Sequence, residues 1–349
     1  MDEIALLRRV RADVPAPSPA ALADARHRLD LAAARATDGP RASAHPSRRR
    51  GRIGIAATAA VAAVGAGVLV LGPWPGAQQP ATAAEVLRDA SSVSRRVPDT
   101  VTRPGQFVRV QTREVSLGYV TGDSTGEAGE GGDGVLGAYV TRLVQTTWVP
   151  HERGDTWVRE AYSTRPDSFY GGPVVRRAAA RDFAVSATAD DPVTERAAGG
   201  LFGNGELGGG PSPGSPDQLD GLPRDPSALL ARLADGPGGS SSRSEEVMSQ
   251  VSAFLRTGVV PHDLRAAMYD ALALLPDVVV TDDQAALDGR RGTAIGVRIG
   301  DVLHEVVIDP ESGEYLGQRD TQLDREGAVP AGTVVDSTAV RVSVVDAAP

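Results

Sequence analysis

The hydrophobic and polar positions from residue 81 onward follow a helical period first and a period of two afterwards. Thr82 and Glu85 have the spacing of a capping box, and apolar residues then recur every three or four positions as far as about Arg96. This pattern predicts one amphipathic helix. The period then changes, and three segments are predicted as strands: Phe107 to Leu117, Tyr139 to Val149, and Thr156 to Tyr162.

Helical spacing returns near residue 225 and gives way to strands after Pro276. Helices are predicted to begin at Asp225-Pro226, at Ser244 and at Pro261. The strands beyond them are joined by links as short as Asp288-Gly289, so consecutive strands must pair antiparallel. The predicted fold class is α+β, an antiparallel sheet packed with helices. The predicted strands are Val278 to Val280, Thr293 to Ile299, Val302 to Ile308, Glu314 to Gln318, and Ala339 to Val345.

Trp148 and Trp157 fall on adjacent predicted strands. Two interpretations are open for them: they belong to the core of the sheet, or they line a groove for an apolar ligand. On a later strand His304 alternates with Val302 and Val306, which predicts an inward-facing, hydrogen-bonded histidine.

The stretch from Arg165 to Pro226 has little periodicity. Its Gly- and Pro-rich part, about residues 199–224, is predicted to be a flexible excursion. Two motifs occur there, G-x-G-x-x-G from Gly203 and G-x-S-x-G from Gly210. Neither stands between a strand and a helix, as a phosphate loop or a nucleophile elbow requires, so both are interpreted as chance matches.

Ahead of these elements, Ile53 to Leu71 holds no charged residue. At about 1.5 Å of rise per residue, a helix of this length covers close to the roughly 30 Å of a bilayer core, which predicts one transmembrane helix. A cleavable signal peptide is the alternative, because Ala81-Thr82-Ala83 has the A-x-A form, but the basic leader of about fifty residues favours an uncleaved anchor.

Basic residues directly before the span predict its orientation, because such residues stay on the cytoplasmic side. Trp74, just after it, has the position of an aromatic residue at the membrane interface. The predicted localisation is the cell membrane, with the N-terminus in the cytoplasm and the bulk of the chain outside. The basic residues are Arg48, Arg49, Arg50 and Arg52. The predicted divisions are a cytoplasmic helical and basic segment (1–52), the transmembrane helix (53–71), a linker (72–81) and an extracytoplasmic α+β domain (82–349).

The N-terminal segment predicts two short helices that are too small to fold securely alone. Their apolar residues are interpreted as a surface that becomes ordered on a cytoplasmic partner, and a membrane-proximal arm without a partner is the alternative. The residues expected to bind the partner are Leu6, Leu7, Val10, Leu22 and Leu29.

The amino-acid composition argues against several kinds of partner, metal site and reaction. The chain of 349 residues has a net charge of -9, no Cys, and Arg as its only long-chain cation. Residues 1–52 carry about +5, which leaves about -14 for the rest and disfavours a nucleic-acid partner outside the membrane. Without Cys, and with its five His spread along the chain, a zinc site is not expected. We expect no cofactor and no enzymatic activity, because no carboxylate pair or nucleophile with its base can be recognised.

The opening MDEIALLRRVRADVPAPSPAALADARHRL, the Arg cluster before a single span, and the block LRAAMYDALALLPDVVV with GRRGTAIGVRI and HEVVIDPESGEYLG resemble an actinobacterial family of uncharacterised single-pass membrane proteins. Genes for extracytoplasmic-function sigma factors often lie beside those of this family, so the resemblance implies a sigma factor as partner. The chain lacks the His and Cys pattern of the zinc-type anti-sigma domain.

Two functional hypotheses follow. In the first, the chain is a membrane-anchored regulator, anti-sigma-factor-like, with an outer domain that senses or binds a signal. In the second, it is an anchored module that binds a lipid or lipoprotein on a curved sheet covered by helices. That arrangement would look like the lipoprotein-carrier fold, an analogy from the order of elements.

Overall fold

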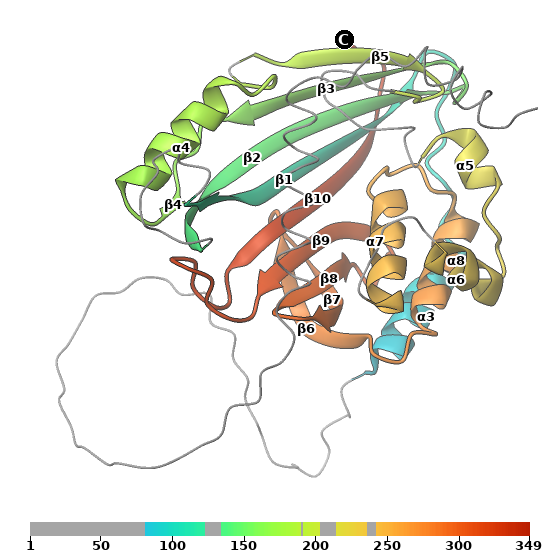
Figure 1. The fold of residues 1–349 in the computed structure, drawn as a ribbon. Helices are drawn as coiled ribbons and strands as arrows, with labels where there is room; N and C mark the ends of the chain where they lie inside the picture. Colours follow the sequence, from blue (N-terminus) through green and yellow to red (C-terminus); the bar gives the residue numbers. More distant parts are fainter. Residues whose placement is uncertain (1–80, 123–133, 190, 203–213, 236–241) are drawn as a thin grey trace, which may run out of the picture. The chain divides into compact units, whose positions relative to one another are not determined.

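The computed structural model describes residues 81–122, 134–189, 191–202, 214–235 and 242–349. The chain divides into two units, Met1–Gly65 and Ala66–Pro349, and all described residues belong to the second. The predicted class is confirmed for this part, because one large antiparallel sheet is packed with helices (Figure 1). In the described ranges, no helix combines the length and the apolar character that a membrane crossing needs. The predicted span from Ile53 to Leu71 lies outside them.

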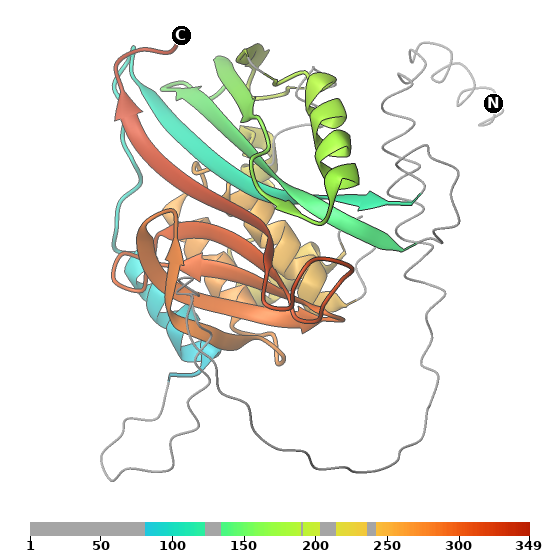
Figure 2. The same ribbon diagram turned by 90° about the vertical axis from the view of Figure 1, so that its left-hand side faces the viewer.

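The sheet has ten strands in the order β5-β3-β2-β1-β10-β9-β8-β7-β6, with β4 beside β2. The C-terminal strand β10 thus joins the two halves of the sheet, between β1 and β9 (Figures 1 and 2). All pairs of these strands are antiparallel, which confirms the prediction for the consecutive strands joined by short links. The strands are β1 (Phe107–Thr121), β2 (Val135–Pro150), β3 (Thr156–Thr164), β4 (Phe169–Tyr170), β5 (Val193–Ala198), β6 (Val279–Leu287), β7 (Arg290–Ile299), β8 (Val302–Ile308), β9 (Tyr315–Gln322) and β10 (Val334–Val345).

Helices α3 and α6 begin at the predicted caps, Thr82 and Asp225, whereas α7 begins slightly before the predicted Ser244, with Ser242 as its cap. Thr82 forms the expected capping box with Glu85, and the Asp225 and Ser242 side chains each accept a hydrogen bond from a backbone N–H of the first turn. The helices are α3 (Ala83–Ser94), α4 (Pro173–Ala184), α5 (Pro216–Asp220), α6 (Pro226–Ala234), α7 (Arg243–Leu255) and α8 (His262–Leu272).

Strand alternation shows that these helices cover one and the same face of the sheet, the helix face. Val108 and Val110 of β1 are buried in the core with the residues of α6, α7 and α8. Val120 lies an even number of residues further along β1, hence on the same face, and it packs with Tyr139 against α4. Helix α4 stands at one end of this face and the other helices at the opposite end (Figure 1).

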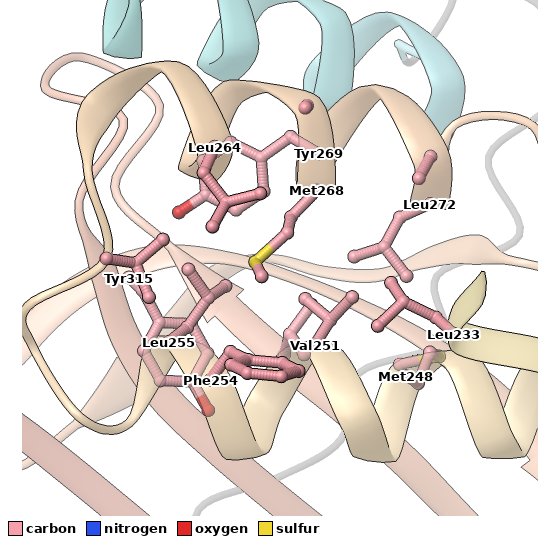
Figure 3. Packing of buried hydrophobic residues seen from close by; sticks show 14 of the residues in the cluster. Leu233, Met248, Val251, Phe254, Leu255, Leu264, Met268, Tyr269, Leu272 and Tyr315 are labelled. Carbon is pink, nitrogen blue, oxygen red and sulfur yellow. The ribbon is translucent and has the colours of Figure 1, made fainter. Parts of the chain in front are cut away.

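The main core lies between the helix face and the helices α3, α6, α7 and α8 (Figure 3). Tyr269 is fully buried there, and its hydroxyl donates to the Gly313 carbonyl at 3.0 Å. Helix α3 packs closely on α8 through small residues, and the Ser91 hydroxyl donates to the Ala266 carbonyl at 3.0 Å. Each buried polar group named here is hydrogen-bonded, as burial requires.

The β6–β7 hairpin reverses at the predicted Asp288-Gly289 turn, where both residues have positive φ, 47° and 76°. This geometry is that of a two-residue type I′ turn. The hairpin tip reaches across to β10, because Arg290 donates to the Val340 carbonyl and Arg341 donates to Asp288. A second, smaller core fills the space beneath the hairpin, on the face opposite the helices: Ala285, Leu287, Ala294, Val307, Leu316 and Ala339.

The stretch with little periodicity contains β4, α4, β5 and α5, which the sequence pattern did not predict. In the described parts of the predicted excursion, 199–202 and 214–224, the chain packs on the core. Phe202, Leu219 and Leu222 are 7%, 1% and 7% exposed and belong to the main cluster. The prediction of a flexible excursion is therefore wrong for these residues, because burying their apolar side chains holds this part of the chain on the core.

Candidate ligand-binding site

The two tryptophans expected near a groove lie on opposite faces of the sheet. Trp157 faces the helices, is 1% exposed, and donates through its Nε1 to the Arg153 carbonyl at 2.8 Å. Trp148 pairs with Val158, the neighbour of Trp157, so its side chain points to the other face. The strands are adjacent, as predicted, but the tryptophans do not line one groove, and the position of Trp157 is filled core.

The remaining residues predicted to bind a partner or the membrane lie outside the described ranges. They are Leu6, Leu7, Val10, Leu22, Leu29, Arg48, Arg49, Arg50, Arg52 and Trp74.

The structure brings together a set of acidic residues on the helix face, between the two groups of helices. Asp336 of β10 is the Cα partner of Asp320 on β9 and of Ser116 on β1. Glu114 lies two residues before Ser116 on β1, and therefore on the same face of the sheet. We call Glu114, Asp336 and Asp320 the acidic row. Neighbouring strands lie about 4.8 Å apart, so the three carboxylates stand close enough to repel one another.

The central carboxyl of the row keeps its proton to a higher pH than an ordinary aspartate does. Burial raises the pKa of Asp336 to about 6, and the charges of Glu114 and Asp320 add to the effect. The Arg256 guanidinium at the end of α7 and a hydrogen bond with Gln318 act in the opposite direction without cancelling it. The proton on Asp336 reduces the negative charge of the row. A positive group bound beside the row would have the same effect and could replace the proton.

A pocket of about 280 Å³ lies between α7 and strands β8 and β9, at one end of the acidic row. Its helical wall comes from one side of α7, and its sheet wall includes Asp320 and His304. His304 is partly buried, with its Nδ1 3.1 Å from an Asp320 oxygen. The α7 residues of the wall are Glu245, Met248, Ser249, Ser252, Ala253 and Arg256.

A second pocket, of about 340 Å³, lies on the same face at the other end of the row. Glu114 lines it, and the chain just after α4 forms its rim at Thr188. The floor over β1, β2 and β3 is mixed: Thr141, Gln145 and Ser163 line it together with Leu143 and Ala161. Both pockets flank β10, the strand that carries Asp336.

Thr338 provides an independent observation on this face. It is 2% exposed and lies between Glu114 and Gln318 in the register of the sheet. Its Oγ1 makes no hydrogen bond with any described residue. Because a buried hydroxyl without a partner is unfavourable, this atom marks a place where a polar group of a ligand or a water molecule is needed.

The spacing of the acidic residues decides what they can hold. Within the described ranges, no three His, Asp or Glu side chains are arranged to hold one metal ion. The row is spread over three strands, with Arg256 and His304 beside it. An extended organic cation, with positive groups separated by several ångströms, matches such a row better than a compact ion.

Sequence analysis did not single out the acidic row, although part of the signal was present. Glu114 falls in the same strand phase as Val108 and Val110, and Asp336 in the same phase as Val340. A carboxylate in the phase of a buried strand face marks a polar interruption of that face. That β1, β10 and β9 lie side by side becomes clear only from the strand order of the sheet.

Comparisons with models of protein families, with curated proteins and with solved structures gave no match to this chain.

Proposed function

We propose that the chain is a membrane-anchored sensory regulator whose outer domain binds a polar, positively charged ligand on the helix face. The observation that carries the proposal is the acidic row, with Asp336 of raised pKa between two pockets. In this proposal the domain binds its ligand without transforming it.

The polarity of the pockets supports a charged ligand. Ligands with hydrocarbon chains are held mainly by apolar and aromatic side chains. Here carboxylates, hydroxyls and amides line both pockets together with aliphatic side chains such as Met248 and Leu143, whereas the large aromatic Trp157 is enclosed in the core. The positive charge of a cation bound beside the row would offset the repulsion among its carboxylates.

The anchoring and the signalling parts of the proposal depend on the sequence. The apolar segment Ile53 to Leu71 and the basic residues before it support a single span with the N-terminus in the cytoplasm. The N-terminal segment, whose predicted helices carry Leu7 and Leu29 on their apolar sides, would contact a transcription component such as a sigma factor. In this arrangement, ligand binding outside changes the availability of the cytoplasmic segment.

The second candidate is an anchored lipid- or lipoprotein-binding module. Its support is architectural, because a broad antiparallel sheet with helices on one face would look like the lipoprotein-carrier fold. The charged helix face favours the first candidate over this one.

A titration with a probe cation tests the binding part. We expect spermidine to bind the full chain with saturation, and more tightly at about pH 7.5 than at about pH 5, because Asp336 must release its proton. Asp336→Asn should weaken binding about tenfold at the higher pH, as the loss of one charged contact does. Asp301→Asn, which removes a carboxylate from an exposed turn, is the matched control. Equal binding by wild type and Asp336→Asn would contradict the proposal, whereas saturable binding of a fluorescent fatty acid would favour the lipid module.

Capture of partners from a native lysate tests the regulatory part. The full chain should retain a sigma factor at moderate salt, and Leu7→Asp and Leu29→Asp should release it, because a buried charge disrupts an apolar interface. If the wild type and both variants capture the same proteins, the N-terminal segment is an anchor arm, and the function lies in the outer domain alone.

A further inference from the structure

A third pocket, of about 350 Å³, opens on the face of the sheet opposite the helices. It lies where β1 and β10 meet the tip of the β6–β7 hairpin. We call it the arginine pocket, because three guanidiniums line it. The polar residues of its wall are Arg109, Gln111, Arg290, Glu314, Arg341 and Ser343.

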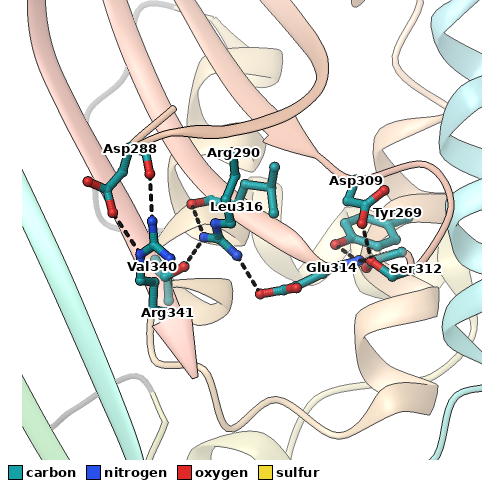
Figure 4. Close-up of polar contacts among 10 residues, drawn as sticks. Tyr269, Asp288, Arg290, Asp309, Ser312, Glu314, Leu316, Val340 and Arg341 are labelled. Atoms are coloured by element: carbon teal, nitrogen blue, oxygen red, sulfur yellow. Dashed lines mark hydrogen bonds and ion pairs between the residues drawn. The ribbon is translucent and has the colours of Figure 1, made fainter. Parts of the chain in front are cut away.

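The sheet register places these residues together. Arg109 is the Cα partner of Ser343, and Gln111 is the Cα partner of Arg341, so all four side chains belong to one face of two adjacent strands. Arg290 arrives from the hairpin, and Glu314 from the start of β9. Figure 4 shows Arg290 beside Arg341, with Glu314 on its far side.

Two of the guanidiniums are fixed in place. Arg290 donates to Glu314 at 2.7 Å and to the carbonyls of Leu316 and Val340. Arg341 donates to the Asp288 carboxylate at 2.8 Å and to the Asp288 carbonyl at 2.6 Å (Figure 4). A binding site built from such groups needs little reorganisation before a ligand binds.

The third guanidinium keeps a donor that the described residues do not satisfy. The Nε of Arg109 is buried from solvent and makes no hydrogen bond with any described residue. The Nε of Arg290 is likewise buried and without a hydrogen bond to the described part of the chain. Two buried charged donors in the wall of one pocket call for an acceptor that the described residues do not provide there.

The charge of the pocket is positive in a chain that is negative as a whole. Its wall holds three Arg and one Glu, and the net charge of the chain is -9. The one carboxylate of the wall already pairs with Arg290. Gln111 and Ser343 add further groups that can donate hydrogen bonds. The pocket thus presents donors and positive charge, which match an oxyanion.

We propose that the arginine pocket binds a phosphate group. Guanidinium forks match the geometry of phosphate oxygens, and several of them around one pocket give both charge and orientation. The phosphate can belong to a free phosphate, a phosphate monoester or a phospholipid headgroup, which share this chemistry. The site is separate from the acidic row on the helix face and does not depend on the function proposed above.

Isothermal titration calorimetry tests this site on the full chain in an uncharged maltoside detergent at fixed ionic strength. The probes are inorganic phosphate, glycerol 3-phosphate and a short-chain phosphatidylglycerol below its micelle concentration, which distinguish the three sources. We expect saturable binding of at least one probe, about tenfold weaker in Arg109→Gln because one charged contact is lost. Arg298→Gln, which removes an exposed arginine from β7, should bind like the wild type.

A second variant keeps the test decisive. Ser343→Asp places a carboxylate opposite Arg109, supplies the missing acceptor and should abolish phosphate binding while the chain stays folded. The proposal is overturned if no probe binds with saturation at concentrations up to about 10 mM, or if Arg109→Gln and Ser343→Asp bind as tightly as Arg298→Gln.

Discussion

The ionisation of Asp336 makes the strongest prediction for stability. Its pKa of about 6 in the folded chain lies above the ordinary value of 3.8, because the carboxyl is buried beside Glu114 and Asp320. Between about pH 4 and pH 6 the folded chain keeps this proton while the unfolded chain releases it. The free energy of unfolding therefore falls as the pH rises through this window, and stays lower above it.

The size of the effect follows from the two pKa values. A difference of about two pH units, at about 1.4 kcal/mol for each, sets an upper limit of about 3 kcal/mol. Partial exposure to solvent screens the repulsion, so we expect about 1–2 kcal/mol. Asp336→Asn removes the charge and should raise the free energy of unfolding by this amount at about pH 8, and leave it nearly unchanged at about pH 3.5.

Urea denaturation, followed by tryptophan fluorescence at both pH values, measures the difference. The buried Trp157 provides a signal that changes when the core opens. Asp301→Asn, at an exposed turn, accounts for the change in net charge. If Asp336→Asn destabilises the chain at pH 8, Arg256 and Gln318 stabilise the carboxylate more than burial and repulsion oppose it, and the reasoning is refuted.

Four further substitutions test other contacts that stabilise the fold. Arg319→Met should lower the free energy of unfolding by about 3–5 kcal/mol, because it leaves Glu305 as a buried charge without its ion-pair partner. The Glu305 side chain is 1% exposed and lies 2.6 Å from Arg319. A thermal transition shifted no more than that of an exposed-arginine variant would contradict this. Trp157→Ala should lower the free energy of unfolding by about 3–5 kcal/mol in urea denaturation, and Trp148→Ala by less, since only Trp157 is in the main core; equal losses would refute this assignment. Thr82→Ala removes the capping box of α3 and should lower the free energy of unfolding by about 1 kcal/mol in the same assay. An unchanged free energy would show that other contacts hold the start of the helix.

Elements with strong local signals were predictable from the sequence. The capping box at Thr82 places α3 within a residue of its observed start, and the alternating segments after Pro276 match β7, β8 and β9 closely. Helix α4 was missed because its cap, Gly172, has no side chain to signal the start, and because its buried stripe of Val175, Ala178, Ala179 and Phe183 is short and half alanine.

The candidate site was less predictable, because it depends on strand order and register. β1 and β10 are adjacent in space but stand more than two hundred residues apart in the sequence, so the closeness of Glu114 and Asp336 has no local signal. The tryptophans show the same limit. A register in which Trp148 opposes Val158 puts Trp148 and Trp157 on opposite faces, and a shift of one residue would have united them.

Hydrogen exchange of the full chain, with and without a saturating cation, tests the central claim most directly. On addition of spermidine, the account predicts slower exchange in α7 and in β9 and β10, the elements around the acidic row, and no such change in Asp336→Asn. Unchanged exchange in these elements, or equal slowing in wild type and Asp336→Asn, would contradict a ligand-binding role for the helix face.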